Sequence, residues 1–303
     1  MKTIIAGGQG LIGTAVAKYF NYLGADVVLL TRNPTTPPPF ARLVKWDGVN
    51  SATWTSELEG ADLVLNLCGR SINCNFTPEN KAAILHSRIQ PTNALGKAIQ
   101  QTATPPKMWI NASAVGIFPA DEHRLWNEND VERNTDFIGQ VCEKWENEFN
   151  ALITPATTKL VARFGVVLAN EGGAFKKLHT LVKLGQGGKQ GSGKQLFSWI
   201  HIADVCSAIS FLMHQKEQSG VYHLTAPEPL SNAQFMATLR KAMHMPFGIP
   251  APAFLIRLGA PILGIEPELI LKGQGVLPTR LLQEGFEFTY DTSEKALADL
   301  CKS

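Results

Sequence analysis

The chain has 303 residues, of which 45% are apolar and 18% are charged, a balance that excludes a disordered protein and is typical of a globular fold. Its formal net charge is only +2 and it has no long block of Lys or Arg, so we expect no nucleic acid partner. No apolar run approaches the roughly 18 residues that span a bilayer, and the N-terminus lacks the apolar core of a signal peptide. We therefore expect no membrane association and a cytoplasmic protein.

The first 32 residues predict a strand, a helix and a second strand. Residues 3–6 form a short apolar strand, and the glycine-rich segment 7–13 follows directly. Apolar residues then recur at helical spacing from Leu11 to Leu23, and Gly24 is placed to end the helix. Residues 26–32 are again mostly apolar, as in a strand that a parallel sheet buries on both faces.

Further strands and helices alternate along the chain. The predicted strands are residues 43–45, 62–67, 107–112 and 159–163. The longest helical segment between them, residues 77–101, begins with Thr77 as its cap and Pro78 in its first turn. Pro91 lies inside this segment and is expected to kink or split the helix. The alternation predicts an α/β protein with a Rossmann-like, doubly wound parallel sheet.

The pattern changes from about residue 165. Predicted elements here are a glycine-rich loop at 185–193, a helix at 203–214 and a strand at 221–224. The remaining residues predict short helices, a strand with alternating aromatic residues at 286–290, and a final helix capped by Asp291 with Glu294. We expect a Rossmann-like nucleotide-binding domain of residues 1–165 and about 203–225. Residues 166–202 and 226–303 would form a smaller, mainly helical substrate lobe.

The segment 7–13 has the context of a dinucleotide-binding loop. It leaves a buried strand and opens a helix, so its backbone can approach a pyrophosphate at the helix N-terminus. The predicted contacts are Gly7, Gly10, Leu11 and Ile12, while Gly13 allows close packing on the sheet. An isolated match of this kind is often only a tight turn, but the flanking strand and helix favour dinucleotide binding.

The end of the second strand indicates which dinucleotide is bound. A site for NAD places an acidic residue there to accept the ribose hydroxyls, and such an acid would repel a 2′-phosphate. This chain has Thr31 and Arg32 instead, and Arg32 can pair with a 2′-phosphate through charged hydrogen bonds. The cofactor is therefore predicted to be NADP(H). The alternative is that Arg32 is an ordinary solvated residue at a strand end.

Several separated motifs follow one another in a familiar order. They are residues 7–13, 31–32, 66–69, 87–88, 113–116, 145–146, 163–168, 191–193 and 198–202, followed by 276–278, 281–282 and 285–288. In these motifs the chain resembles the atypical, extended short-chain dehydrogenases/reductases called epimerase family proteins, or NAD-dependent epimerase/dehydratase-like proteins. The last three motifs resemble the small C-terminal domain of unknown function (DUF1731) of that family.

The resemblance implies a Rossmann-like domain that binds NADP(H) and a C-terminal lobe that supplies substrate residues. It also implies that Leu67, Cys68, Arg88 and Val167 line the cofactor beside the glycine loop. Leu67, Cys68 and Val167 are equally well explained as apolar core at strand ends. Arg88, on a helix close to the predicted crevice, suits a polyphosphate.

The catalytic pair of this superfamily is missing. Extended short-chain dehydrogenases remove a hydroxyl proton with a tyrosine whose pKa is lowered by a lysine four residues later. Tyr19, Tyr22, Tyr222 and Tyr290 are followed four positions later by Leu23, Asp26, Ala226 and Glu294. The helix expected to carry the pair, residues 136–148, has Phe137 and Ile138 where the tyrosine might fall, and Val141 and Cys142 lie four residues after them. Phe118 stands where relatives often have an aromatic hydroxyl. Neither the base nor its activating cation is predicted.

Two residues remain as catalytic candidates, Ser113 and His201. Ser113 ends a predicted strand, where it could orient a carbonyl or hydroxyl group, although a serine that stabilises a turn is the alternative. His201 is titratable near neutral pH, but it could equally be a packing residue, with Asp204 capping the next helix. Arg163 is a candidate for binding an anionic group of the substrate, or for pairing with a buried acid.

The leading hypothesis is an NADP(H)-binding, oxidoreductase-like protein related to nucleoside-diphosphate-sugar epimerases and dehydratases, acting on a small polar or nucleotide-linked metabolite. The alternative is a non-catalytic NADP(H)-binding module that reports the redox state of the cofactor. The scattered cysteines and histidines form no ligand pattern, so we predict no disulfide framework and no metal. The expected partners are a small-molecule substrate and, in any oligomer, a second copy of the chain.

Overall fold

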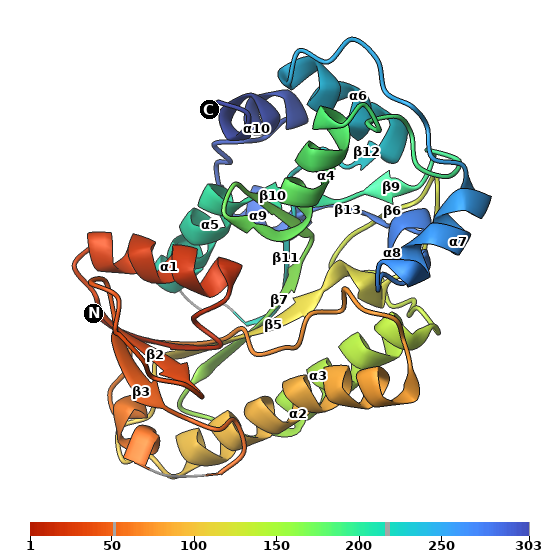
Figure 1. Ribbon diagram of the computed structural model, residues 1–303. Coiled ribbons are helices and arrows are strands. Elements are labelled where there is room, and N and C mark those ends of the chain that lie inside the picture. Colours follow the sequence, from red (N-terminus) through yellow and green to blue (C-terminus); the bar gives the residue numbers. More distant parts are fainter. Residues whose placement is uncertain (51–52, 216–218, 303) are drawn as a thin grey trace.

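The fold is that of an α/β protein with three layers, shown by a computed structural model that describes residues 1–50, 53–215 and 219–302 (Figure 1). Its centre is a seven-stranded sheet in the order β11-β7-β5-β4-β1-β2-β3, and every neighbouring pair is parallel. The strands are β1 (Lys2–Ala6), β2 (Asp26–Thr31), β3 (Arg42–Lys45), β4 (Leu63–Asn66), β5 (Met108–Ala114), β7 (Thr158–Phe164) and β11 (Gly220–Leu224). The strand order reverses between β1 and β4, and ligands of such sheets bind beyond the carboxyl ends at this point. The predicted Rossmann-like fold is confirmed.

Two pairs of helices cover the two faces of the sheet. In Figure 1, α1 (Leu11–Tyr22) and α5 (Ile202–His214) lie over one face, and α2 (Pro78–Gln100) and α3 (Phe137–Ala151) lie over the other. Successive residues of a strand point to opposite faces, so Ile5 packs with Phe20 of α1 whereas Ile4 packs with Leu95 of α2. This two-sided burial explains why most positions of the central strands are apolar.

Pro91 does not divide α2. The helix is continuous from Pro78 to Gln100, with Thr77 as the predicted cap accepting a hydrogen bond from the Asn80 amide. A proline inside a helix costs about 3 kcal/mol. The residues that follow Pro91, from Thr92 to Ile99, are mostly buried against the sheet, and this packing offsets the missing hydrogen bond.

A separate apolar core lies in the C-terminal half. It joins β8 (Val166–Ala169) and β10 (Trp199–His201) to α4 (Gly173–Lys183), α6 (Asn232–Ala242) and α10 (Ser293–Leu300). The short elements around it are β6 (Leu125–Trp126), β9 (Leu196–Phe197), β12 (Leu230–Ser231), β13 (Gly275–Val276), α7 (Ala253–Ile262), α8 (Glu268–Leu271) and α9 (Thr279–Gln283). The 3-10 helices are Thr53–Leu58 and Val115–Ile117. In the ranges covered by the structure, no helix has both the length and the apolar character needed to cross a membrane.

Two predictions for the C-terminal segment are wrong. Residues 286–290 form no strand, because the amides of Thr289 and Tyr290 donate to the buried carboxylate of Asp204 rather than to a neighbouring strand. The alternating aromatic residues pack instead on α5, where Phe286 contacts Phe211. The cap of α10 is Thr292, one residue after the predicted Asp291.

Candidate functional site

The glycine loop is packed too closely for side chains at two of its predicted positions. Gly7 has a φ of +75°, and a Cβ there would lie 2.9 Å from the carbonyl group of Leu67 at the end of β4. A Cβ on Gly13 would lie 2.5 Å from the Cα of Gly8, so the first turn of α1 rests directly on the loop. The loop is thus a backbone surface at the reversal between β1 and β4, where a ligand can come close to the main chain.

The N-terminus of α1 has no capping side chain. Gly10 is its N-cap, and the first helical hydrogen bond runs from the Thr14 amide to the Gly10 carbonyl oxygen. The amides of Leu11 and Ile12 precede that bond, and no acceptor among the residues that the structure describes is assigned to them. Free amides and the helix dipole make such an end attractive to a phosphate group.

The end of β2 places a cation beside this loop. The hydroxyl of the buried Thr31 donates to the Gln9 side-chain oxygen and accepts from the Asn33 amide at 3.3 Å. Arg32 is exposed and, across the described ranges, has no hydrogen bond or ion pair with another residue. Burial raises the pKa of Cys68 to about 12, an effect that the positive charge of Arg32 partly offsets.

The other predicted cofactor residues surround the same crevice. Leu67 and Cys68 follow β4, and the Cys68 amide donates to the Asn66 side chain at 3.1 Å. Arg88 packs against Gly69 and donates to the Arg70 carbonyl oxygen at 3.2 Å, which ties α2 to the segment after β4. Cofactor contact by these three residues therefore remains a prediction, while their packing role is visible.

Val167 reaches the loop through the C-terminal half. It lies in β8, and Gly173 brings its carbonyl oxygen and the Leu11 side chain together, since both lie within 4 Å of a Cβ built on Gly173. The turn before α4 thus touches the first residue of α1. A displacement of the C-terminal half would therefore move residues that lie next to Leu11 of the glycine loop.

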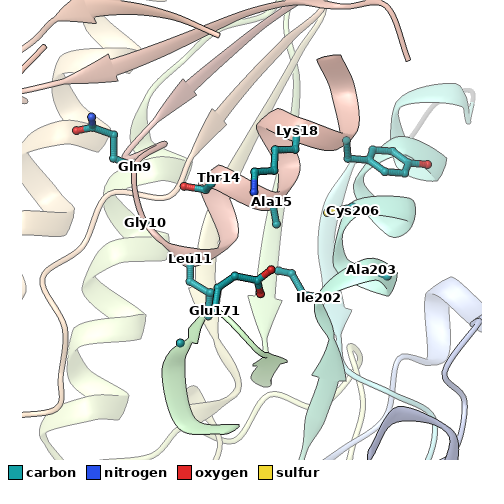
Figure 2. Close-up of a pocket in the computed structure, with 12 residues that line it drawn as sticks. Gln9, Gly10, Leu11, Thr14, Ala15, Lys18, Glu171, Ile202, Ala203 and Cys206 are labelled. Carbon is teal, nitrogen blue, oxygen red and sulfur yellow. The ribbon is translucent and has the colours of Figure 1, made fainter. Parts of the chain in front are cut away.

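A cavity of about 530 Å³ opens beside the loop (Figure 2). It is bounded by α1, α5 and the turn at Glu171, and it shares Gln9, Gly10 and Leu11 with the glycine loop. Its other walls include Lys18 and Cys206 but none of Thr31, Arg32, Leu67 or Cys68. The cavity therefore adjoins the predicted cofactor crevice without coinciding with it.

Ser113 and Arg163 meet at a buried glutamate that sequence reasoning missed. The Ser113 hydroxyl donates to Oε1 of Glu146 at 2.6 Å, and Arg163 donates to both oxygens of the same carboxylate at 2.8 Å. All three residues are at most 6% exposed. Arg163 thus takes the second of its two expected roles, the pair with a buried acid. Ser113 directs its hydrogen toward Glu146, so only its lone pairs are left for another group.

A second buried polar network joins the carboxyl end of β4 to the middle of β5. The Asn66 side chain donates to Thr92 at 2.9 Å and to Asn111 at 2.6 Å, and the Trp145 ring nitrogen also donates to Thr92. The signal in the sequence is an asparagine within each of two apolar strands, at the end of β4 and in the middle of β5. The network locks α2 and α3 to the edge of the sheet where the crevice opens.

The side chains at the positions where the tyrosine and lysine are expected are apolar or buried. Ile138 packs so closely on Gly116 that a Cβ on the glycine would lie 2.7 Å from it. Cys142 is buried and its pKa is raised to about 12, chiefly by burial, so it remains a neutral thiol. The Phe118 ring stacks on Trp126 with centroids 5.2 Å apart. None of these three side chains can act as a base at neutral pH.

His201 serves as a helix cap. Its Nδ1 accepts the Ala203 amide at 3.2 Å at the start of α5, and its ring packs on Tyr290 with centroids 3.8 Å apart. Burial lowers the pKa of His201, so the ring is neutral near pH 7. The expectation that Asp204 caps α5 is wrong, because its carboxylate binds two backbone amides of the C-terminal segment.

Glu128 and His223 form a further buried pair that the sequence did not indicate. Oε1 of Glu128 accepts the amides of His223 at 3.2 Å and of Arg280 at 3.4 Å, which joins β11 and α9 to the turn after β6. Burial raises the pKa of Glu128 and lowers the pKa of His223 to about 3. Both side chains are therefore pushed toward their neutral forms.

Comparison with known proteins places these features in a family. A 34% identical epimerase family protein of Staphylococcus epidermidis aligns over 100% of this chain and 99% of its own length. The chain belongs to the epimerase family. Within this family member, residues 3–139 match the NAD dependent epimerase/dehydratase family, and residues 251–300 match a domain of unknown function, DUF1731. The expected resemblance is confirmed over both halves.

Solved structures agree with the family assignment. The human epimerase family protein SDR39U1, solved with NADPH, is 29% identical, covers 100% of both chains and has a TM-score of 0.89. A nucleoside-diphosphate sugar epimerase from Corynebacterium glutamicum is 28% identical with a TM-score of 0.78, and the match spans 99% of this chain and 58% of that one. This epimerase family member thus has the Rossmann-like fold of dinucleotide-binding relatives.

Proposed function

We propose that this epimerase family member binds NADP(H) at the glycine loop and uses it in an oxidoreductase-like reaction on a small polar or nucleotide-linked metabolite. The observation that carries the proposal is the exposed, unpaired Arg32 next to the uncapped N-terminus of α1. An NADPH-bound structure of the human relative supports the choice of cofactor.

The residues present fit the group. The amides of Leu11 and Ile12 would hold the pyrophosphate, the Gly7 and Gly13 backbone would allow its close approach, and Arg32 would pair with the 2′-phosphate. The bound cofactor supplies hydride chemistry, and the protein's own task is to hold and orient it.

The test is the preference between NADPH and NADH. Replacing Arg32→Ala removes a charged hydrogen bond and should weaken NADPH binding by about 10- to 100-fold, while NADH binding changes little. Arg257→Ala, which removes an exposed arginine from α7, is the matched control and should leave both affinities unchanged. Calorimetry measures both. An unchanged ratio of the two affinities in Arg32→Ala would overturn the proposed NADP(H) site.

A second candidate is a non-catalytic module that senses the redox state of NADP(H). It is favoured by the Ser113 hydroxyl, which is committed to Glu146, and by the apolar side chains at Ile138 and Cys142. The two candidates differ in turnover: an enzyme consumes the nicotinamide absorbance of NADPH when a suitable carbonyl metabolite is added. A sensor shows no such turnover across a broad panel of carbonyl metabolites, and it binds a partner when only one redox form of the cofactor is present.

A further inference from the structure

One face of α7 is apolar and uncovered. Ile256 and Ala260, four residues apart, anchor the helix on the protein and are buried. The opposite side presents a row formed by Phe254, Leu258 and Ile262, also spaced by four residues. The row, together with the neighbouring Leu255 and Leu263, is 51 to 86% exposed. We call these five residues the α7 patch. Figure 1 shows the helix at the periphery of the C-terminal half, beside α8.

The α7 patch is large for a surface that faces water. Its five side chains expose roughly 600 Å², at the upper end of the about 300 to 600 Å² typical of the largest apolar patch on a monomer. Arg257 is the only charged residue of the helix, and at 100° per residue it lies to one side of the row. No charge therefore interrupts the apolar surface.

The helix is held in a fixed position. The Asn75 side chain donates to the Pro261 carbonyl oxygen at 3.1 Å, and the Phe76 amide donates to Glu266 at 3.3 Å. These bonds fasten α7 and the turn before α8 to the segment between β4 and α2. Gly259 has no atom within 4 Å of a Cβ built on it, so there is open space for a second helix to come close. A patch fixed in advance loses little conformational entropy on association.

We propose that the α7 patch is the self-association surface of the chain, on which two copies pack α7 against α7 around a twofold axis. Rows of residues spaced by four interdigitate when two such helices cross at about −50°, so the same row can fit itself. A twofold contact needs this self-complementarity. A stable interface buries about 800 Å² per partner, and the patch supplies roughly three quarters of that as an apolar centre. A second copy therefore fits both the size and the uncharged character of the patch.

The oligomeric state of the full chain tests the proposal. Sedimentation velocity should show a dimer once the protein concentration reaches about 100 µM, because a specific interface of this size is populated in that range. Leu258→Glu places two carboxylates opposite each other near the axis and should raise the dimer dissociation constant at least about 100-fold. The matched control is Ile153→Glu, because Ile153 is 75% exposed but lies just beyond α3, and this variant should stay dimeric.

A second variant keeps the test independent of stability. Leu258→Cys should form a disulfide-linked dimer on mild oxidation, whereas the unaltered chain with its native Cys74 and Cys301 should not. A chain that is monomeric at about 100 µM, or a dimer that Leu258→Glu does not weaken, contradicts the proposal. Binding of monomers to phospholipid vesicles through the same residues would assign the patch to a membrane and overturn it as well. None of these measurements involves the cofactor.

Discussion

The two ends of the crevice differ in how their polar groups are used. At the glycine loop, the amides of α1 and the guanidinium of Arg32 have no partner in the described ranges of the chain. At the ends of β5 and β7, Ser113, Glu146 and Arg163 bind one another and are buried. Groups left without a partner are ready for a ligand, whereas groups satisfied internally hold the fold together. The comparison favours the proposed cofactor binding over catalysis as the role of this site.

The contrast between the two ends of the crevice would be contradicted if Glu146 contributed nothing to the stability of the fold. Glu146→Ala leaves the buried Arg163 without a counterion, so we expect the free energy of unfolding to fall by about 3 to 5 kcal/mol. Denaturant titration measures this loss. Glu146→Gln, which keeps the volume and an acceptor for Ser113, should give a smaller loss and a folded protein in which NADPH affinity is unchanged.

Glu143 offers the control on the same helix. It is exposed on α3, so Glu143→Ala should change stability by less than about 0.5 kcal/mol. A Glu146→Ala variant as stable as Glu143→Ala would show that the buried pair contributes nothing to the fold.

A glycine substitution probes the other end of the crevice. A Cβ on Gly13 would lie 2.5 Å from Gly8, so Gly13→Ala should push the loop away, cost about 1 to 3 kcal/mol of stability and weaken NADPH binding at least about tenfold. Calorimetry and thermal melting report the two effects. Gly259→Ala meets no neighbouring atom and should leave NADPH binding unchanged. Equal NADPH affinity in both variants would contradict the close approach of a ligand to the loop.

The smallest expected effect is a dependence of stability on pH. The pKa of His223 is about 3 in the folded protein, whereas its ordinary value is 6.5. The unfolded chain therefore binds a proton that the folded one does not, and the free energy of unfolding should fall by about 1.4 kcal/mol between pH 7.5 and 5.5. In His223→Gln, denaturant titrations at the two pH values should show this contribution removed.

Glu128 acts with the opposite sign. The pKa of Glu128 is raised in the folded protein, so protonation of this carboxyl group stabilises the fold at pH values below the ordinary carboxyl pKa. This stabilisation is lost as the pH rises through the pKa of the folded state. Glu128→Gln should therefore steepen the fall of stability on acidification.

A His223→Gln variant with the pH dependence of the unaltered chain would show that the His223 ring is protonated to the same extent in the folded and unfolded states.

Much of the fold follows from local patterns. Apolar runs predicted the strands of the sheet, and the glycines with a flanking strand and helix predicted the nucleotide loop, because backbone requirements are written in adjacent residues. The segment 286–290 was mistaken for a strand because its alternating aromatic residues are also what an extended chain needs to pack on a helix. Only Asp204, far away in sequence, decides that its amides bond to a carboxylate.

The buried polar groups of the site could not be predicted in the same way. Glu146 belongs to the motif 145–146, but nothing near it in the sequence reveals that it is buried and paired while Glu143 is exposed, since its partners come from β5 and β7. The roles of Ser113 and Arg163 depend on that one carboxylate. The position at a strand end was enough to identify these residues as candidates. What each of them binds depends on the three-dimensional arrangement of the strands.

The pairing of β6 with β13 has a consequence for the order in which the chain is completed. Residues 125 and 126 bond to residues 275 and 276, and Glu128 accepts the amide of Arg280. During synthesis, the turn after β6 leaves the ribosome long before its partners exist. Closing so long a loop carries an entropic cost that local contacts cannot repay early. The apolar cluster that contains Phe118 and Trp126 is therefore completed only after Val276 has been synthesised.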